Sequence, residues 1–162
     1  NLGTAILASL VIGMFDATLE QMVALAVLMP IVASMGGNAG TQTLTITVRA
    51  LAMKDLTKYN TFRTFRKELI VGFLNGCVFA CLAGIITVFW FSHLGNAYLL
   101  GAIIAVAMII NLVVAGVSGV ALPILLERLK VDPAVASGVL VTTITDVVGF
   151  LAFLGLASIF LL

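Results

Sequence analysis

Residues 134–162 read AVASGVLVTTITDVVGFLAFLGLASIFLL, an apolar run whose one charged residue, Asp146, lies near its middle. At about 1.5 Å per residue in a helix, this run is long enough to cross the roughly 30 Å hydrocarbon core of a bilayer. A carboxylate at the centre of a membrane helix costs about 2.5–3.5 kcal/mol on insertion scales, so such residues usually face protein or water. The stretch therefore predicts a membrane helix that carries a functional acid.

The residues around Asp146 are small and polar on one side of the predicted helix. Their spacing of three and four residues places them on one helical face, and they are Gly138, Thr142, Thr145, Asp146 and Gly149. Leu, Ile, Val and Phe occupy the opposite face. This division predicts one face for lipid and one for water or ions.

The composition is that of an integral membrane protein. Hydrophobic residues make up 62% of the 162-residue chain and charged residues only 9%, whereas soluble domains carry about 25% charged residues. A net charge of +1 gives no indication of a nucleic-acid partner. The chain starts at Asn1 and is apolar from Leu2, so we expect Leu2–Met14 to be the remaining part of a first helix in a longer polypeptide.

The apolar runs predict an all-α, polytopic membrane protein of five transmembrane helices. They are Leu2–Met14, Met22 to about Met53, Leu69–Phe91, Ala97–Leu126 and Ala134–Leu162. Pro30 and the glycines of residues 36–40 predict that the second helix is kinked or partly unwound. The connections are an acidic loop at Phe15–Gln21, a basic one at Lys54–Glu68, and short ones at Ser92–Asn96 and Glu127–Pro133, where Asp132-Pro133 is a good helix start.

Charge placement predicts the orientation of this five-helix chain. The basic residues lie near the end of the second helix or within the connections Lys54–Glu68 and Glu127–Pro133, whereas the other two loops have none. Five helices put the two basic connections on the same side, which the positive-inside rule makes cytoplasmic. We therefore expect a multi-pass protein of the cell membrane with a cytoplasmic N-terminus and an external C-terminus.

The second helix has a polar face of its own. Asn38, Gln42, Thr45 and Arg49 recur at helical spacing, with further threonines beside them at positions 41, 43 and 47. A single threonine at membrane depth usually joins two helices, but amides and several hydroxyls after a glycine break favour the lining of a wet path. Asn38, Gln42 and Thr45 are accordingly predicted to line a pore, together with Thr145 and Gly149.

Two stretches resemble one known family. PIVASMGGNAGTQTLTITVRALA, residues 30–52, is similar to the signature of the MgtE family of magnesium channels, GGNxGxQ followed by a spacer and Arg-Ala. DPAVASGVLVTTITDVVGF, residues 132–150, resembles the last membrane helix of the same family. With the five-helix count, the resemblance covers essentially the whole chain.

The resemblance implies a homodimer in which Mg²⁺ passes along the two-fold axis between helices two and five. Whether other divalent cations pass as well, and the selectivity among Mg²⁺, Mn²⁺, Co²⁺ and Ni²⁺, stays open at this point. It implies that Asp146 binds the ion and that Thr142 and Gly138 help to hold it in hydrated form, partly through backbone carbonyl. It also implies cytoplasmic magnesium-sensing domains, which we expect to lie outside residues 1–162. Residues 1–162 are then expected to be the transmembrane, ion-conducting domain.

Elementary chemistry agrees with a magnesium ion at this position. Two copies of Asp146 across an axis repel each other, and a divalent cation neutralises both. Mg²⁺ keeps its waters, so one carboxylate per chain with hydroxyls and carbonyls suits it, whereas Ca²⁺ or Zn²⁺ sites would need more ligands.

Other classes of protein fit the sequence less well. A two-aspartate intramembrane protease needs a second acid at membrane depth, yet Asp146 is the only carboxylate in the apolar runs, so we expect no enzyme. A structural anchor has no reason to bear the cost of the polar stripe. A carrier that exchanges Mg²⁺ for Na⁺ or H⁺ at Asp146 remains the alternative to a channel.

Overall fold

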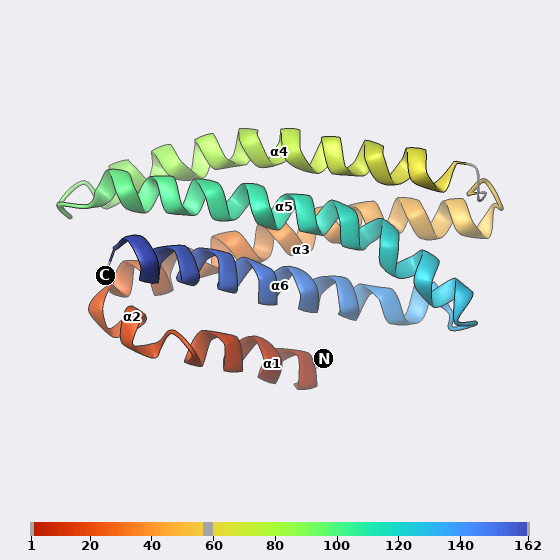
Figure 1. Cartoon of the computed structure of the whole chain (residues 1–162), viewed down its shortest axis with the longest axis horizontal. Coiled ribbons are helices and arrows are strands. Elements are labelled where there is room, and N and C mark those ends of the chain that lie inside the picture. Colours follow the sequence, from red (N-terminus) through yellow and green to blue (C-terminus); the bar gives the residue numbers. More distant parts are fainter. Residues whose placement is uncertain (1, 57–59, 162) are drawn as a thin grey trace.

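The computed structural model describes residues 2–56 and 60–161, all of whose regular elements are helices. Figure 1 shows them as α1 (Leu2–Gly13), α2 (Asp16–Gln21), α3 (Val23–Ala52), α4 (Thr61–Trp90), α5 (Ala97–Arg128) and α6 (Pro133–Phe160). The all-α prediction is confirmed for this part of the chain. The segment 57–59, with its basic residue Lys58, and the terminal residues Asn1 and Leu162 lie outside the described residues.

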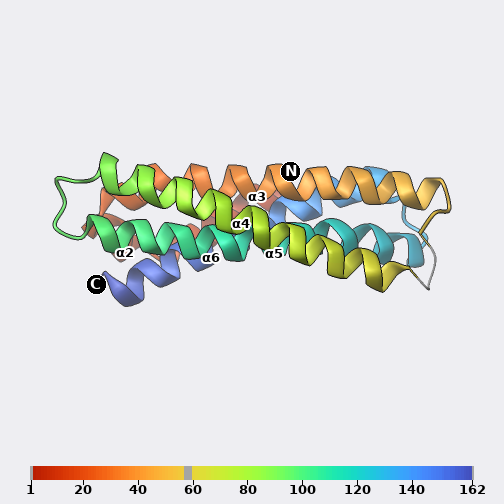
Figure 2. The same ribbon diagram turned by 90° about the horizontal axis from the view of Figure 1, so that it is seen from above.

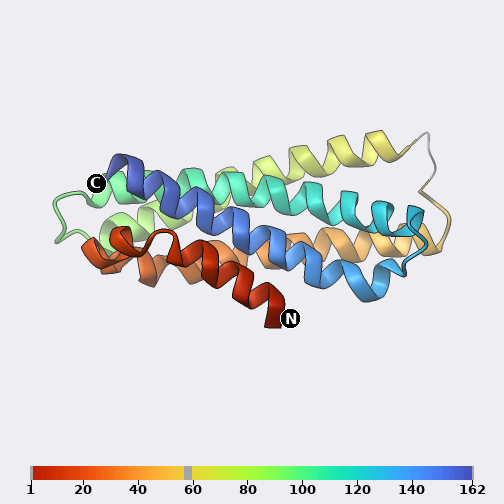
Figure 3. The ribbon, with the colours of Figure 1, turned by 60° about the horizontal axis from the view of Figure 1, so that its bottom comes forward.

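Helix α5 forms the centre of the bundle. It packs against α3, α4 and α6, whereas α4 packs mainly on α5 and lies at one side of the molecule (Figures 1 and 2). On the other side, α1 lies along α6 (Figure 3). Small residues allow the close contact of α4 with α5: a Cβ added to Gly72 would lie 2.8 Å from the carbonyl oxygen of Leu112.

Four of the described helices, α3 to α6, are long and apolar enough to cross a membrane. Helix α1 is apolar but has 12 residues, too few for the roughly 20 that a crossing requires. The four long helices establish a multi-pass membrane protein, and the fifth crossing stays a prediction.

Helix α3 differs from its predicted form because it continues without unwinding past Pro30 and through residues 36–40. The two buried glycines of this stretch are contact points with other helices: an added Cβ would overlap the Asn111 amide at Gly36, and at Gly40 it would lie 2.5 Å from Val141 Cγ1. Neighbouring helices thus compensate for the low helix propensity of glycine. The partial unwinding predicted here is wrong.

Two predicted connections also contain helix. The expected loop Phe15–Gln21 forms the short helix α2, and α4 begins at Thr61 instead of Leu69. The segment from Thr61 to Glu68 contains Arg, Lys and Glu, which favour helix as strongly as most apolar residues do, so the helix extends beyond the apolar run. Glu68 therefore lies within a long helix and not in a loop.

The basic connections meet at one end of the bundle. The end of α3, the start of α4 and the turn between α5 and α6 lie at this end, and the connection from α4 to α5 lies at the opposite end (Figure 1). At the start of α6 the Ala134 N–H donates a hydrogen bond to Asp132 Oδ1 (2.9 Å), with Pro133 in the first turn. The predicted helix start at Asp132-Pro133 is confirmed.

Candidate cation site

Asp146 lies halfway along α6, as the fourteenth of its 28 residues, and is half-buried. Its carboxylate makes no hydrogen bond or ion pair with any residue that the structure describes. Arg49, the one basic residue within the apolar part of α3, is exposed in the last turn of that helix. Within one chain, the charge of Asp146 therefore has no counter-charge among the described residues.

Thr142 and Gly138 precede Asp146 by one and two helical turns. Thr142 is exposed, and its Oγ1 donates a hydrogen bond to the backbone oxygen of Gly138 across 3.0 Å. Because this bond occupies the hydroxyl proton, the free lone pairs of Oγ1 remain to accept hydrogen bonds. The waters of a hydrated cation are donors, so such an oxygen suits them.

Thr145 and Gly149 lie on the inner side of the same stripe. Thr145 is fully buried, with 0% of its surface exposed, and its Oγ1 donates to the Thr142 carbonyl across 3.0 Å. Gly149 is also buried, and a Cβ added there would lie 2.7 Å from Asn111 Nδ2. The predicted polar stripe of α6 is thus divided: Thr145 and Gly149 are packed against other helices, whereas Thr142 is exposed.

The polar face of α3 is open in one chain. Asn38, Gln42 and Thr45 are exposed, while the opposite face of the helix is buried in the bundle. Thr45 Oγ1 donates to the Thr41 carbonyl across 2.8 Å, which again leaves an acceptor oxygen on the surface. At membrane depth such a face requires water or protein beside it, because lipid cannot satisfy its polar groups.

Asn111 of α5 is a structural residue that sequence reasoning missed. It is fully buried, and its Nδ2 donates a hydrogen bond to the backbone oxygen of Val32 across 2.8 Å. Its amide lies against both Gly36 of α3 and Gly149 of α6, so it joins the two helices that carry the candidate site. A lone asparagine in a 32-residue apolar helix was the available signal.

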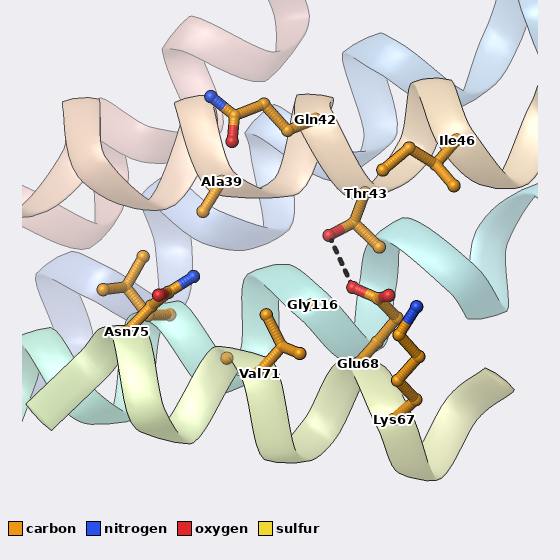
Figure 4. Close-up of a pocket in the computed structure, with 11 residues that line it drawn as sticks. Ala39, Gln42, Thr43, Ile46, Lys67, Glu68, Val71, Asn75 and Gly116 are labelled. Carbon is orange, nitrogen blue, oxygen red and sulfur yellow. Dashed lines mark hydrogen bonds between the residues drawn. The ribbon is translucent and has the colours of Figure 1, made fainter. Parts of the chain in front are cut away.

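Glu68 was also missed, because it was assigned to a loop. Figure 4 shows it at a pocket of about 260 Å³ between α3, α4 and α5, where Thr43 Oγ1 donates a hydrogen bond to Glu68 Oε2 across 3.1 Å. Gln42 and Asn75 line the same pocket. The pocket adds a polar junction between α3 and α4.

Four long apolar helices with acidic, amide and hydroxyl groups halfway along them define a multi-pass membrane protein with polar groups at membrane depth. Residues 29–156 match the MgtE family, described as a divalent cation transporter. The chain belongs to this family.

Curated relatives agree with this assignment. The chain is 38% identical over 151 residues, 93% of its length, to the magnesium transporter MgtE of Bacillus subtilis. It is 37% identical over 98% of its length to that of Thermus thermophilus, and 35% identical over 91% to that of Enterococcus faecalis. The chain spans about a third of the length of each relative.

Proposed function

We propose that this chain conducts hydrated Mg²⁺ across the cell membrane as one half of a homodimer, with the ion path on the two-fold axis between α3 and α6. The observation that carries the proposal is Asp146, a half-buried carboxylate at the midpoint of an apolar helix with no counter-charge among the described residues. Such a group costs free energy in a membrane unless something neutralises it. A divalent cation shared by two chains neutralises both copies.

The oxygens near Asp146 support a hydrated ion as the cargo. Thr142 offers lone pairs beside the carboxylate because its proton is bound to Gly138. Mg²⁺ gives up water reluctantly, so a protein that holds it through its waters needs acceptors such as these in place of a cage of carboxylates. The same chemistry admits Mn²⁺, Co²⁺ and Ni²⁺, which form similar hydrated ions.

The open face of α3 completes the proposed lining. Asn38, Gln42 and Thr45 would face the ion path, and a second copy of the chain would cover them from lipid. Because Thr145 and Gly149 are buried within one chain, we place them behind the lining, where they hold α6 against α3 and α5. Their part in conduction is then to position Asp146 and Thr142.

Charge supports an orientation for this path. The end of the bundle with the connections near Arg63 and Arg128 would face the cytoplasm, as the positive-inside rule requires. The N-terminus would then be cytoplasmic and the C-terminus external.

The proposal is tested by Mg²⁺ flux into liposomes that contain the purified protein. Asp146→Asn keeps the shape of the side chain and removes its charge, so we expect flux to fall at least tenfold. Glu20→Gln removes an exposed acid of α2 and should leave flux unchanged. Equal flux through Asp146→Asn and the unmodified protein, at equal protein content, would contradict the proposal.

A second measurement separates a channel from a carrier that exchanges Mg²⁺ for Na⁺ or H⁺. Planar-bilayer recording should show discrete unitary Mg²⁺ currents that do not require a counter-ion gradient. Flux that depends on Na⁺ or H⁺, without unitary currents, would favour the carrier.

A further inference from the structure

A basic pocket lies on the outer surface of α4 near its start. It has a volume of about 350 Å³ and is lined by Arg63, Thr64, Arg66, Lys67, Ile70 and Val71. The three cationic side chains are exposed, and none of them forms an ion pair with a described residue. Cations gathered over an apolar floor, none of them in an ion pair with a described acid, suit an anion that has an apolar part.

The position of this basic pocket along α4 indicates where the anion would come from. Large apolar side chains are exposed along α4 from Leu69 to Trp90. At 1.5 Å per residue this run is about 33 Å long, close to the thickness of a bilayer core. Trp90 and the nearby Tyr98 are exposed at its far end, as is typical of a membrane interface. The basic pocket therefore lies at the depth of the lipid headgroups on the other interface.

Among the described residues, no other helix covers this surface. Helix α4 lies at the edge of the bundle and packs mainly on α5 (Figures 1 and 2). Of the four long helices it has the smallest buried share, 22% of its most apolar window. In a membrane, lipid is the neighbour of such a face.

We propose that the basic pocket binds the phosphate of an anionic phospholipid. Arg63 and Arg66 would bind its oxygens, since a guanidinium pairs with phosphate through two parallel hydrogen bonds. Ile70 and Val71 would contact the glycerol and the first methylenes of the acyl chains. Soluble phosphate offers no partner for this apolar floor, so the lipid is the ligand that uses the whole pocket.

The chain supplies a matched control at the same end of the bundle. Arg128, the last residue of α5, and Lys130, in the turn that follows, are exposed there, and neither lines the basic pocket. Arg63→Gln/Arg66→Gln and Arg128→Gln/Lys130→Gln each remove two positive charges. A difference between the two variants therefore reports the pocket and not the net charge.

The test measures lipid binding to the protein purified in a neutral detergent, by native mass spectrometry. We expect phosphatidylglycerol to bind about tenfold more tightly than phosphatidylcholine, and 10 mM inorganic phosphate not to displace it. Arg63→Gln/Arg66→Gln should lose this preference, whereas Arg128→Gln/Lys130→Gln should keep it. Because both arginines are exposed, the substitutions should leave the elution volume on size exclusion unchanged.

Four results with the unmodified protein and the two glutamine variants would overturn the proposal. They are equal binding of the two lipids by the unmodified protein, an unchanged preference after Arg63→Gln/Arg66→Gln, an equal loss in both double variants, and displacement by inorganic phosphate. An equal loss would mean attraction by net charge alone. Displacement would make soluble phosphate the ligand. Arg63→Lys/Arg66→Lys, which keeps the charge and loses the paired hydrogen bonds, should retain only part of the preference, and full retention would also count against the pocket.

Discussion

The hydroxyl of Thr43 on α3 donates a hydrogen bond to the carboxylate of Glu68 on α4 across 3.1 Å (Figure 4). Both residues lie against glycines of α5: an added Cβ on Gly119 would lie 2.8 Å from Thr43 Cβ, and one on Gly116 would lie 2.9 Å from the Glu68 carbonyl oxygen. Close packing on α5 thus brings the two helices within hydrogen-bonding distance. The bond joins α3 to α4 at the residue next to Gln42, and Gln42 belongs to the open polar face of α3.

We expect Thr43→Val and Glu68→Ala to be energetically coupled, because each removes one side of this hydrogen bond. A double-mutant cycle of unfolding free energies in detergent should give a coupling of about 0.5–1.5 kcal/mol, the usual net value of such a bond. Glu68→Gln keeps an acceptor oxygen and should retain most of the stability. Additive effects of the two substitutions would mean that the contact contributes nothing.

Alanine substitutions at the neighbouring glycines Gly36 and Gly37 of α3 should have different effects on the free energy of unfolding. At Gly36 the new methyl group would overlap the buried Asn111 amide, so Gly36→Ala should lower the unfolding free energy by about 1–3 kcal/mol. At Gly37 nothing lies within 4 Å of an added Cβ, so Gly37→Ala should be neutral or stabilise by up to about 1 kcal/mol. Thermal unfolding midpoints of the two variants compare them directly, and equal midpoints would contradict this packing.

Much of the fold follows from the sequence, because hydrophobic runs of membrane length have few alternatives to helix. The starts of α5 at Ala97 and of α6 beside Asp132 were predicted closely. The continuity of α3 was not predicted. Glycine and proline lower the helix propensity of a segment, but contacts with neighbouring helices can compensate, and the sequence of the segment does not show those contacts. Glu68 was misplaced for a related reason, since polarity marks the end of an apolar run and not the end of a helix.

The stripe on α6 shows the corresponding limit for the candidate site. Helical spacing placed Thr145 beside Thr142 on one face, but it carried no information about which edge of that face another helix covers. In the structure, α3 packs against Thr145 and covers the edge of the stripe on which Thr145 lies. Only contacts between distant parts of the chain, such as Gly40 with Val141, distinguish a buried threonine from an open one.

Substitutions at two adjacent threonines of α6 can distinguish a role in ion conduction from a role in helix stability. Thr142 and Thr143 each donate a hydrogen bond to the carbonyl four residues earlier, but Thr142 is exposed and Thr143 is half-buried. Thr142→Ala should reduce Mg²⁺ flux severalfold, less than Asp146→Asn because the Gly138 carbonyl survives, whereas Thr143→Ala should leave flux near that of the unmodified protein. Equal effects would place the role of Thr142 in helix stability.

The orientation can be measured with single cysteines in a background that lacks Cys77 and Cys81. Gly95 lies in the connection from α4 to α5, where nothing lies within 4 Å of an added Cβ, and Arg128 is exposed at the other end of the bundle. A membrane-impermeant maleimide applied to intact cells should label Gly95→Cys and not Arg128→Cys. The reverse pattern would invert the proposed orientation.

The central claim is that Asp146 holds a divalent cation, and metal density tests it most directly. Mn²⁺ takes the same oxygen ligands as Mg²⁺ and gives an anomalous X-ray signal, so crystals of the protein grown with Mn²⁺ would locate the ion. The account predicts an anomalous peak on a two-fold axis between two Asp146 carboxylates, absent from crystals of Asp146→Asn. A structure of the dimer with no peak beside Asp146, or with a peak that Asp146→Asn retains, would contradict it.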